Sequence, residues 1–246
     1  MIEGLYTSVS GMTAAMWVQA RLAHDMTNAS TVGYKRLHTS LSDFAAVLET
    51  MDPEGNVTLQ SDGNGVAVVR EVTDYSQGPM RNTNRALDVA LSGPGFIEVQ
   101  TDAGLRYTRA GRLHQNQAGM LVTSEGHAVM GETGPIQIPV GEVSITETGA
   151  ILVNGEQRAR LTIVEFTNPD ALERVGGTAF APGVDAGPRV AAETRVQQGY
   201  LEGANVDISH DMASLIAVQR MYQLAQRMTL TQDEILSQTV NDLAKI

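Results

Sequence analysis

Apolar or small residues recur at alternating spacings of three and four near the N-terminus. They are Ile2, Leu5, Val9, Met12, Met16, Ala23 and Met26, with Gln19 as the polar residue in the same register. This spacing places them on one face of a helix. The pattern stops at the turn-forming residues 28–33, so we expect a helix over residues 2–29, about 40 Å long at 1.5 Å per residue.

The pattern changes between residues 66 and 200, where short runs of high β-propensity alternate with turn-forming residues. The runs cover residues 66–72, 96–99, 120–123, 136–140, 143–145, 150–153 and 160–166. Among the turns, Asn154 and Gly155 favour a type I′ hairpin, which needs positive φ at both positions. Short strands at this spacing predict an antiparallel sandwich or barrel-like module.

A second long helix is expected after Gly203, since no proline or glycine follows. Asp207 or Ser209 is the candidate N-cap, and Asp211 lies favourably in the first turn. One apolar stripe consists of Leu215, Val218, Tyr222, Ala225, Leu236 and Leu243, with polar Thr229 and Gln232 between them. A second stripe consists of Met221, Leu224, Met228 and Ile235. A helix with two apolar stripes needs more than one neighbour.

The terminal helices carry more apolar surface than one antiparallel pair can bury, so we expect self-assembly through them. The predicted fold class is α+β, with long N- and C-terminal helices packing as an intersubunit coiled-coil bundle around a central antiparallel β-rich domain. We expect an assembly helix over residues 1–30 and a connecting segment over 31–65. A β-rich outer domain is expected over 66–200 and a second assembly helix over 201–246.

The connecting segment carries two patterns. Leu37, Leu41, Phe44 and Leu48 have helical spacing and predict a short amphipathic helix. Residues 51–56 and 62–65 are rich in turn formers and predict a mobile connection. The run from Asp62 to Gly65 resembles a calcium loop only superficially, because the downstream bidentate Glu is missing.

Composition excludes several classes of function. The formal net charge of −11 opposes binding to nucleic acid or to an anionic membrane surface, whose phosphates require clustered Lys and Arg. The absence of cysteine excludes disulfides, thiolate metal sites and cysteine nucleophiles. The N-terminal residues show no signal peptide of the usual pattern, and no apolar run approaches the roughly 20 residues that span a bilayer, so we expect no membrane insertion.

The sequence shows no catalytic or metal-binding constellation. The five histidines are His24, His38, His114, His127 and His210. They form no HExxH pattern and no close pair. The run Gly93-Pro94-Gly95 precedes a strand and lacks the third glycine of a dinucleotide fingerprint, and Ser8 and Ser10 lie in no nucleophile motif. We therefore expect no enzyme activity, no cofactor and no metal.

Three ordered segments resemble the rod and hook family of the flagellar basal body, over nearly the whole chain. The first covers residues 23–35, where an amphipathic helix ends in an Asn- and Thr-containing turn followed by Gly33, Tyr34 and Lys35. The second comprises residues 86–91, 93–99, 107–111 and 119–123, which are similar to the family's entry into its sheet. The third covers residues 199–206, which are similar to the turn before the family's terminal helix.

The resemblance implies a structural subunit of the rod, the periplasmic drive shaft that transmits torque to the hook and filament. The implied partners are other copies of the chain, proximal and distal rod proteins, and the flagellar type III export apparatus. Such subunits are exported unfolded, without cleavage of a leader. The terminal helices line the inner tube, and the β-rich module faces outward. Residues 85–91 and 131–139 favour the proximal part of the rod over the distal part.

Fifteen residues are expected at the subunit interface: Leu5, Val9, Met12, Met16, Met26, Asn28, Thr31, Gly33, Tyr34, Leu215, Val218, Tyr222, Met228, Ile235 and Leu236. The methionines could instead belong to an ordinary core, and the four turn residues could serve only to end the helix. The terminal helices are also expected to be largely disordered in a free monomer and to fold on docking.

A second hypothesis comes from a different class of protein, a carbohydrate-binding or carbohydrate-hydrolysing β-module with helical extensions. Such a module needs paired carboxylates or an aromatic platform in a cleft. The chain has a single tryptophan, Trp17, and it lies on the first predicted helix. The sequence therefore favours the assembly protein.

Overall fold

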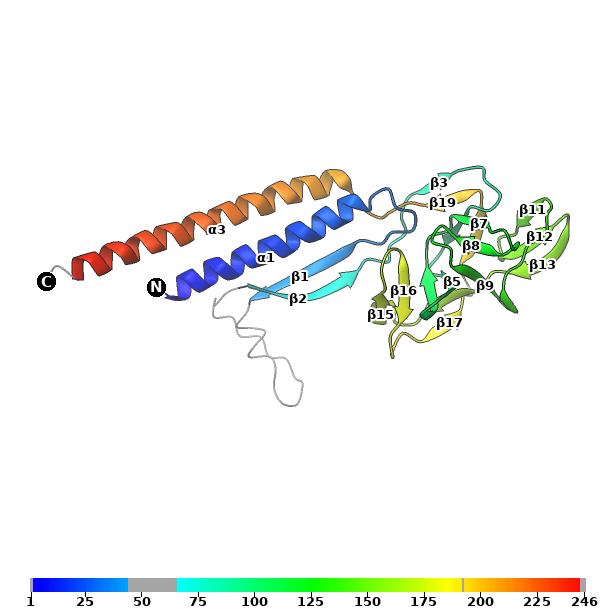
Figure 1. Ribbon diagram of the computed structural model, residues 1–246, viewed down its shortest axis with the longest axis horizontal. Coiled ribbons are helices and arrows are strands. Elements are labelled where there is room, and N and C mark those ends of the chain that lie inside the picture. The colour runs from blue at the N-terminus through cyan, green and yellow to red at the C-terminus, as the bar shows by residue number, and fades with distance from the viewer. Residues whose placement is uncertain (1, 44–65, 192, 244–246) are drawn as a thin grey trace. The chain divides into compact units, whose positions relative to one another are not determined.

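The structure is a computed structural model that describes residues 2–43, 66–191 and 193–243. Long helices and many antiparallel strands occur in these residues (Figure 1), which confirms the predicted α+β class with a β-rich core. Contacts divide the chain into a helical unit of Met1–Thr27, Leu37–Val72 and Asp207–Ile246, and a β-rich unit of Asn28–Arg36 and Thr73–Val206. The domain boundaries expected from the sequence stay a prediction.

The helical unit contains α1 (Ile2–Thr27) and α3 (Ile208–Leu243). The two helices pack side by side and run in opposite directions (Figure 1). A two-stranded sheet of β1 (Leu37–Asp43) and β2 (Val66–Thr73) completes the unit, and β1 packs on α1. Both long helices that the apolar spacing predicts are therefore present.

The short helix expected around Leu37 and Leu41 is wrong, because residues 37–43 form β1. Ser and Thr occupy three of the seven positions of β1, and these residues have low helix propensity. Pairing with the valine-rich β2 satisfies the backbone of β1 instead. Phe44 and Leu48 lie outside the described residues, as do residues 51–56 and 62–65 of the expected connection.

The start of α3 distinguishes the two candidate caps. The carboxylate oxygen Oδ1 of Asp207 accepts hydrogen bonds from the backbone N–H groups of Ser209, at 3.0 Å, and His210, at 3.1 Å. These are two of the amides that a helix leaves without a partner at its N-terminus. Asp207 is therefore the N-cap, and Asp211 lies in the first turn as expected.

We expect Asp207→Ala to destabilise α3 by about 1 kcal/mol, because two helix amides lose their acceptor. The matched control is Ser209→Ala, which changes the competing candidate and should cost less than about 0.5 kcal/mol. Helicity followed by circular dichroism during urea unfolding measures both changes. A larger loss for Ser209→Ala would assign the cap to that residue.

The β-rich unit consists of short strands joined by tight turns (Figure 1). Its strands are β3 (Met80–Asn82), β4 (Val89–Ser92), β5 (Phe96–Thr101), β6 (Gly104–Thr108), β7 (Leu113–Gln115), β8 (Leu121–Thr123), β9 (Ala128–Gly131), β10 (Gly134–Pro135), β11 (Val143–Ile145), β12 (Ala150–Val153), β13 (Glu156–Arg160), β14 (Ile163–Phe166), β15 (Leu172–Arg174), β16 (Ala179–Pro182), β17 (Pro188–Val190), β18 (Arg195–Gln198) and β19 (Tyr200–Glu202). A 3-10 helix, η1 (Pro169–Ala171), precedes β15.

The strands pair antiparallel in several sheets. Among the described residues, the main sheet has ten strands, in the order β15-β16-β6-β5-β9-β8-β7, with β10 on β9 and with β14 pairing both β5 and β17. Smaller sheets join β11, β12 and β13, then β18 and β4, then β19 and β3. The turn between β12 and β13 has φ of 52° at Asn154 and 85° at Gly155, so the positive φ values expected of a type I′ hairpin are confirmed.

Two apolar clusters form the core of this unit. The larger is aliphatic and draws on strands β4, β5, β7, β8, β9, β11, β12, β14 and β18, with Leu113 completely buried. The smaller is aromatic, and in it Phe96 contacts Phe166 and Phe180 edge to face, with ring centroids 5.6 and 5.8 Å apart. Edge-to-face contacts of this kind stabilise beyond the burial of area alone.

We expect Leu113→Ala to lower the free energy of unfolding of the β-rich unit by about 2–5 kcal/mol, because it leaves a cavity in the aliphatic cluster. The control is Leu105→Ala, at a position that is 41% exposed, where the loss should stay below about 1 kcal/mol. Urea unfolding of both variants provides the measurement. Similar losses at the two positions would contradict the assignment of Leu113 to the core.

Candidate functional site

The two predicted stripes of α3 differ in exposure. The first stripe is half-buried at Leu215, Val218, Tyr222, Ala225 and Leu236. Because α1 packs along α3, we attribute this burial to α1. The first stripe therefore packs within the chain.

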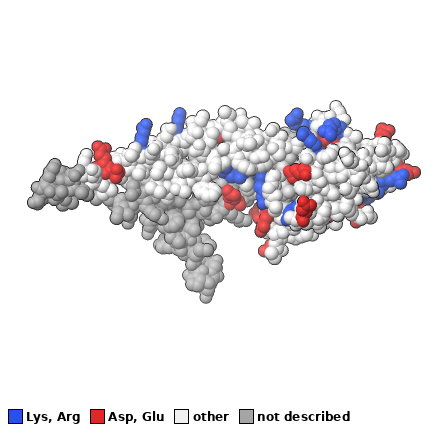
Figure 2. Space-filling model, viewed as in Figure 1, with Lys and Arg blue, Asp and Glu red and all other residues white. Residues whose placement is uncertain are grey.

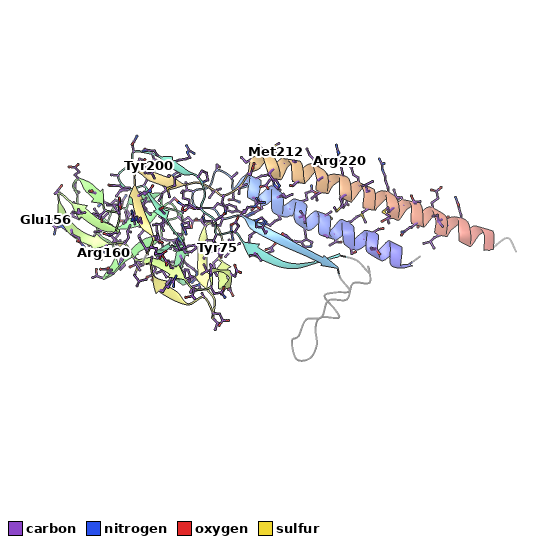
Figure 3. The ribbon with its side chains drawn as sticks, turned by 180° about the vertical axis from the view of Figure 1, so that it is seen from behind. Tyr75, Glu156, Arg160, Tyr200, Met212 and Arg220 are labelled. Carbon is purple, nitrogen blue, oxygen red and sulfur yellow. The ribbon has the colours of Figure 1, made fainter. Side chains whose placement is uncertain are left out.

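The second stripe is exposed. Met221, Leu224, Met228 and Ile235 have exposed fractions between 48% and 60%. Met212, labelled in Figure 3, is exposed as well. Large apolar side chains spaced along one helix face differ from the scattered exposed residues of an ordinary surface, and they typically mark an interaction site.

The predicted seam of α1 is only partly covered. Val9 and Met16 are exposed, whereas Met12 and Met26 are half-buried. Leu5 lies in α1, but its side chain is outside the described part. Trp17 is 58% exposed.

The buried face of α1 is a different one, which the apolar spacing did not reveal. It includes Ser8, Ala14, Ala15, Leu22 and Asp25. Small residues allow neighbouring elements to pack closely, and α1 contacts both α3 and β1. The seven-residue spacing of Ser8, Ala15 and Leu22 is the signal that could have identified this face.

A group of exposed residues on the terminal helices is named the open apolar surface below. It consists of Val9, Met16, Trp17, Met221, Leu224, Met228 and Ile235. Figure 2 shows few charged side chains on the visible face of the helices, compared with many on the visible face of the β-rich unit. The open apolar surface is therefore suited to contact with other apolar helices.

The turn after α1 is held within the chain. Thr31 Oγ1 donates to Asn28 Oδ1 at 3.3 Å, and the Gly33 N–H donates to the Glu202 carbonyl at 2.8 Å. Tyr34 is buried, and the guanidinium carbon of Arg174 lies 4.9 Å from the centre of its ring. The role of Gly33 and Tyr34 in this structure is internal, and a contact of this turn with a neighbouring subunit stays a prediction.

The three segments that carry the sequence resemblance meet at one buried group of charges. Lys35 Nζ lies 2.6 Å from Glu202 Oε1, and both side chains are 0% exposed. Arg109 Nη1 lies 3.4 Å from Glu202 Oε2, with 2% of its side chain exposed. Lys35, Arg109 and Glu202 are named the buried ion cluster below.

Neighbouring groups add further contacts to the buried ion cluster. Lys35 Nζ also donates to the Ser76 carbonyl at 2.6 Å, and the Gly78 N–H donates to Glu202 Oε1 at 2.9 Å. The Arg109 guanidinium lies over the Phe96 ring, 4.9 Å from its centre. Hydrogen bonds of this kind make a buried charge tolerable, although Arg109 Nε is buried without a hydrogen-bond partner among the described residues.

Asn205 forms hydrogen bonds with two other chain segments that lie next to the cluster. Its Nδ2 donates to the Asp74 carbonyl at 2.8 Å, and its Oδ1 accepts from the Arg36 N–H at 2.7 Å. One side-chain amide thus joins residues before β1, after β2 and after β19.

Burial dominates the electrostatics of the cluster. It lowers the pKa of Lys35 and the pKa of Arg109, and the Glu202 carboxylate opposes both shifts by attraction and hydrogen bonding. Two cations share this carboxylate, so loss of Glu202 would leave buried positive charge without its partner. The cluster is closed to solvent, which suits a structural role and not one in binding a substrate.

The described residues contain no group of three or more His, Asp or Glu side chains that could hold a metal ion. None of the helices described is long and apolar enough to cross a membrane.

Comparisons with known proteins identify the family. Residues 197–243 match the family described as flagellar basal body rod FlgEFG protein C-terminal, and residues 90–153 match the flagellar hook protein FlgE/F/G D1 domain. The chain is 30% identical over 256 residues to the flagellar basal-body rod protein FlgG of Buchnera aphidicola subsp. Schizaphis graminum (strain Sg), covering 96% of this chain and 98% of that protein. The chain belongs to the FlgE/F/G family of flagellar rod and hook proteins.

Other FlgE/F/G relatives match over their full length. The chain is 28% identical over 261 residues to FlgG of Bacillus subtilis (strain 168), covering 98% of this chain and 99% of that protein. It is also 28% identical over 250 residues to FlgF of Caulobacter vibrioides (strain ATCC 19089 / CIP 103742 / CB 15), covering 100% of both chains. The predicted resemblance is thus confirmed, and sequence identity does not separate FlgF from FlgG.

We expect Gly33→Ala to disrupt the packing around the buried ion cluster. A Cβ at Gly33 would lie 2.4 Å from the backbone nitrogen of Ala110, and the residue has φ of +70°. The control is Gly126→Ala, where φ is +89° but no atom lies within 4 Å of the added Cβ. Since φ is positive at both positions, the difference between the two variants isolates the steric clash.

Thermal unfolding of both glycine variants measures the effect. Gly126→Ala should cost about 1–2 kcal/mol from backbone strain, and Gly33→Ala should cost at least about 3 kcal/mol. Equal losses would show that residues 28–36 do not pack on the segment around Arg109 in solution.

Proposed function

We propose that this protein is a structural subunit of the flagellar basal-body rod and not an enzyme. Membership of the FlgE/F/G family supports the role, since relatives matched over nearly their whole length are named basal-body rod proteins. The observation that carries the proposal is the open apolar surface on the terminal helices, which a subunit of an assembly would bury against its neighbours.

The proposed assembly is an intersubunit coiled-coil bundle of terminal helices. Exposure supports this role most directly for Val9, Met16, Met228 and Ile235 of the expected interface residues. The half-buried residues of the first stripe of α3 would serve the contact with α1 of the same chain. Contact with the open apolar surface of other copies, and with other rod proteins, would then order the helices fully.

The proposed location is the periplasmic rod, where the subunit would transmit torque to the hook and filament. The proposed route is the flagellar type III export apparatus, with no cleaved leader. Family membership supports both proposals.

Within the rod we propose the proximal position, that of FlgF. Residues 85–91 and 131–139 resemble FlgF most, and the alignment with the Caulobacter FlgF covers 100% of both chains. The distal rod protein FlgG is the alternative, supported by relatives of similar identity. The stage at which rod growth stops when the gene is deleted distinguishes the two.

Neither Trp17 nor a surface hollow of the β-rich unit supplies the aromatic platform that the carbohydrate-binding alternative calls for. The exposed Trp17 lies on α1 and not on the β-rich unit. A surface hollow of that unit, lined by residues including Gln115, Gln137 and Arg158, has no aromatic residue among its lining side chains. An aromatic platform of the kind that binds sugars is absent from this hollow.

Deletion of the gene in a motile host tests the proposed function. A rod role requires that basal bodies isolated from the deletion strain carry an incomplete rod and that motility is lost. Intact, rotating flagella would overturn the proposal.

A complementation experiment tests the open apolar surface itself. We expect the double variant Leu224→Glu and Met228→Glu to fold but to fail to restore motility, because two carboxylates would have to be buried in the bundle. The matched control is Gln226→Glu, an exposed polar position on the same helix, which should restore motility. Circular dichroism of the purified variants checks that α3 still forms.

The complementation experiment has a clear opposing outcome. If the double variant restores motility and rod growth as well as the control does, the second stripe of α3 lies outside the assembly interface. If Gln226→Glu abolishes motility and the double variant does not, the assignment of the second stripe to the assembly interface is likewise contradicted.

A further inference from the structure

We propose that the buried ion cluster is a latch, which closes last when the β-rich unit folds and opens first when the unit unfolds. The proposal does not rest on the rod function, because it concerns only contacts within this unit. The cluster joins residues that lie far apart in the sequence. Lys35 and Glu202 are 167 positions apart, Gly78 and Glu202 are 124 apart, and Arg109 and Glu202 are 93 apart.

Most strand pairs of the main sheet join residues that are closer in sequence, whereas β4 pairs with β18 and β3 with β19 over distances similar to those of the cluster and close together with it. Strands β5 and β6 are consecutive and meet at the turn between Thr101 and Gly104. Strands β7, β8 and β9 follow in order and pair in order, as do β11, β12 and β13. Because the entropy lost on closing a loop grows with its length, the local pairs form before the contacts of Glu202.

The cluster does not tolerate partial formation. Glu202 without Lys35, or Lys35 without Glu202, would be a buried charge that lacks its partner, which is costlier than leaving both in water. The backbones of Gly78 and Gly203 also approach closely, since a Cβ at Gly78 would lie 2.1 Å from the Gly203 carbonyl oxygen. The segments on both sides must therefore reach their final positions together.

The aromatic cluster must also be packed before the latch can close. Arg109 lies over the ring of Phe96, and that ring is fixed by its contacts with Phe166 and Phe180. Residues 28–36 and 199–206, together with β3, β4 and β18, thus close onto the strands that residues 96–190 have already paired. A chain that emerges from its N-terminus cannot complete this unit until residue 202 is available.

Pulsed hydrogen exchange during refolding of the full chain tests the order directly. The latch reporters are the amides of Gly33 and Gly78, which donate to the backbone and the side chain of Glu202. The core reporters are the amides of Leu121 and Ile136, which donate to the carbonyls of Ile136 and Val129. We expect the core amides to become protected at least about tenfold earlier. Simultaneous protection, or earlier protection of the latch, would overturn the proposal.

Variants of the full chain provide a second, kinetic test. Glu202→Gln and Lys35→Met should each raise the unfolding rate on the order of a hundredfold and change the folding rate by less than about threefold. The matched control is Arg158→Met, which removes an equally short pair, 2.6 Å from Glu156, that is exposed on both sides. Its rates should stay within about threefold of the original. A fall in the folding rate comparable to the rise in the unfolding rate would place the cluster in the folding nucleus and refute the latch.

A third variant covers the case in which the single changes prevent folding. Replacing the cluster together, as Lys35→Met, Arg109→Met and Glu202→Leu, removes every charge at once and leaves none without a partner. This variant should fold at the original rate within about threefold. A much slower folding rate would show that the charges act early and not last.

Discussion

The contact between Lys35 and Glu202 is the constraint that fixes how the end segments of the β-rich unit pack together. It joins the segment that follows α1 to the strand that precedes α3, two places 167 positions apart. With Arg109 it links three stretches of sequence that lie far apart in the chain. Because both side chains are fully buried, the pair can be neither solvated nor replaced by water, and every neighbouring segment must fit around it.

The glycines around this pair show how closely the backbones approach. Gly33 packs against the backbone of Arg109 and Ala110, and Gly78 packs against Gly203. Each of the three segments that resemble the family thus supplies a charged residue or a glycine to the buried ion cluster or its surroundings. We infer that the three segments are similar to the family because they pack against one another around this cluster.

The sequence predicted the positions of the helices and strands better than it predicted which face of each helix is buried. Apolar spacing located α1 and α3, and Asn154 with Gly155 located a hairpin, because these signals are local. It failed for β1, where pairing with a strand further along the chain overrides the helical spacing of Leu37 and Leu41. It also missed the buried face of α1, because Ser8 and Ala15 carry no hydrophobic signal although their small size is what permits close packing.

Sequence patterns likewise predicted only part of the candidate site. The second stripe of α3 could be recognised as surplus from its spacing alone, since a helix pair buries one face of each helix. The buried ion cluster could not be found in this way, because Lys35, Arg109 and Glu202 are charged residues that sequence reasoning assigns to the surface. Only their juxtaposition across distant segments shows that they belong to the interior.

The β-rich unit buries one ion cluster beside an apolar core, whereas the terminal helices expose apolar side chains, so the stability of the unit and the proposed assembly rest on different interactions. The buried ion cluster lies inside the β-rich unit, where salt screens it weakly. Apolar side chains cover the outside of the helices, where their association depends on the hydrophobic effect and weakens on cooling. Low temperature should thus weaken assembly while leaving the buried ion cluster intact, because the two rely on different interactions in different places.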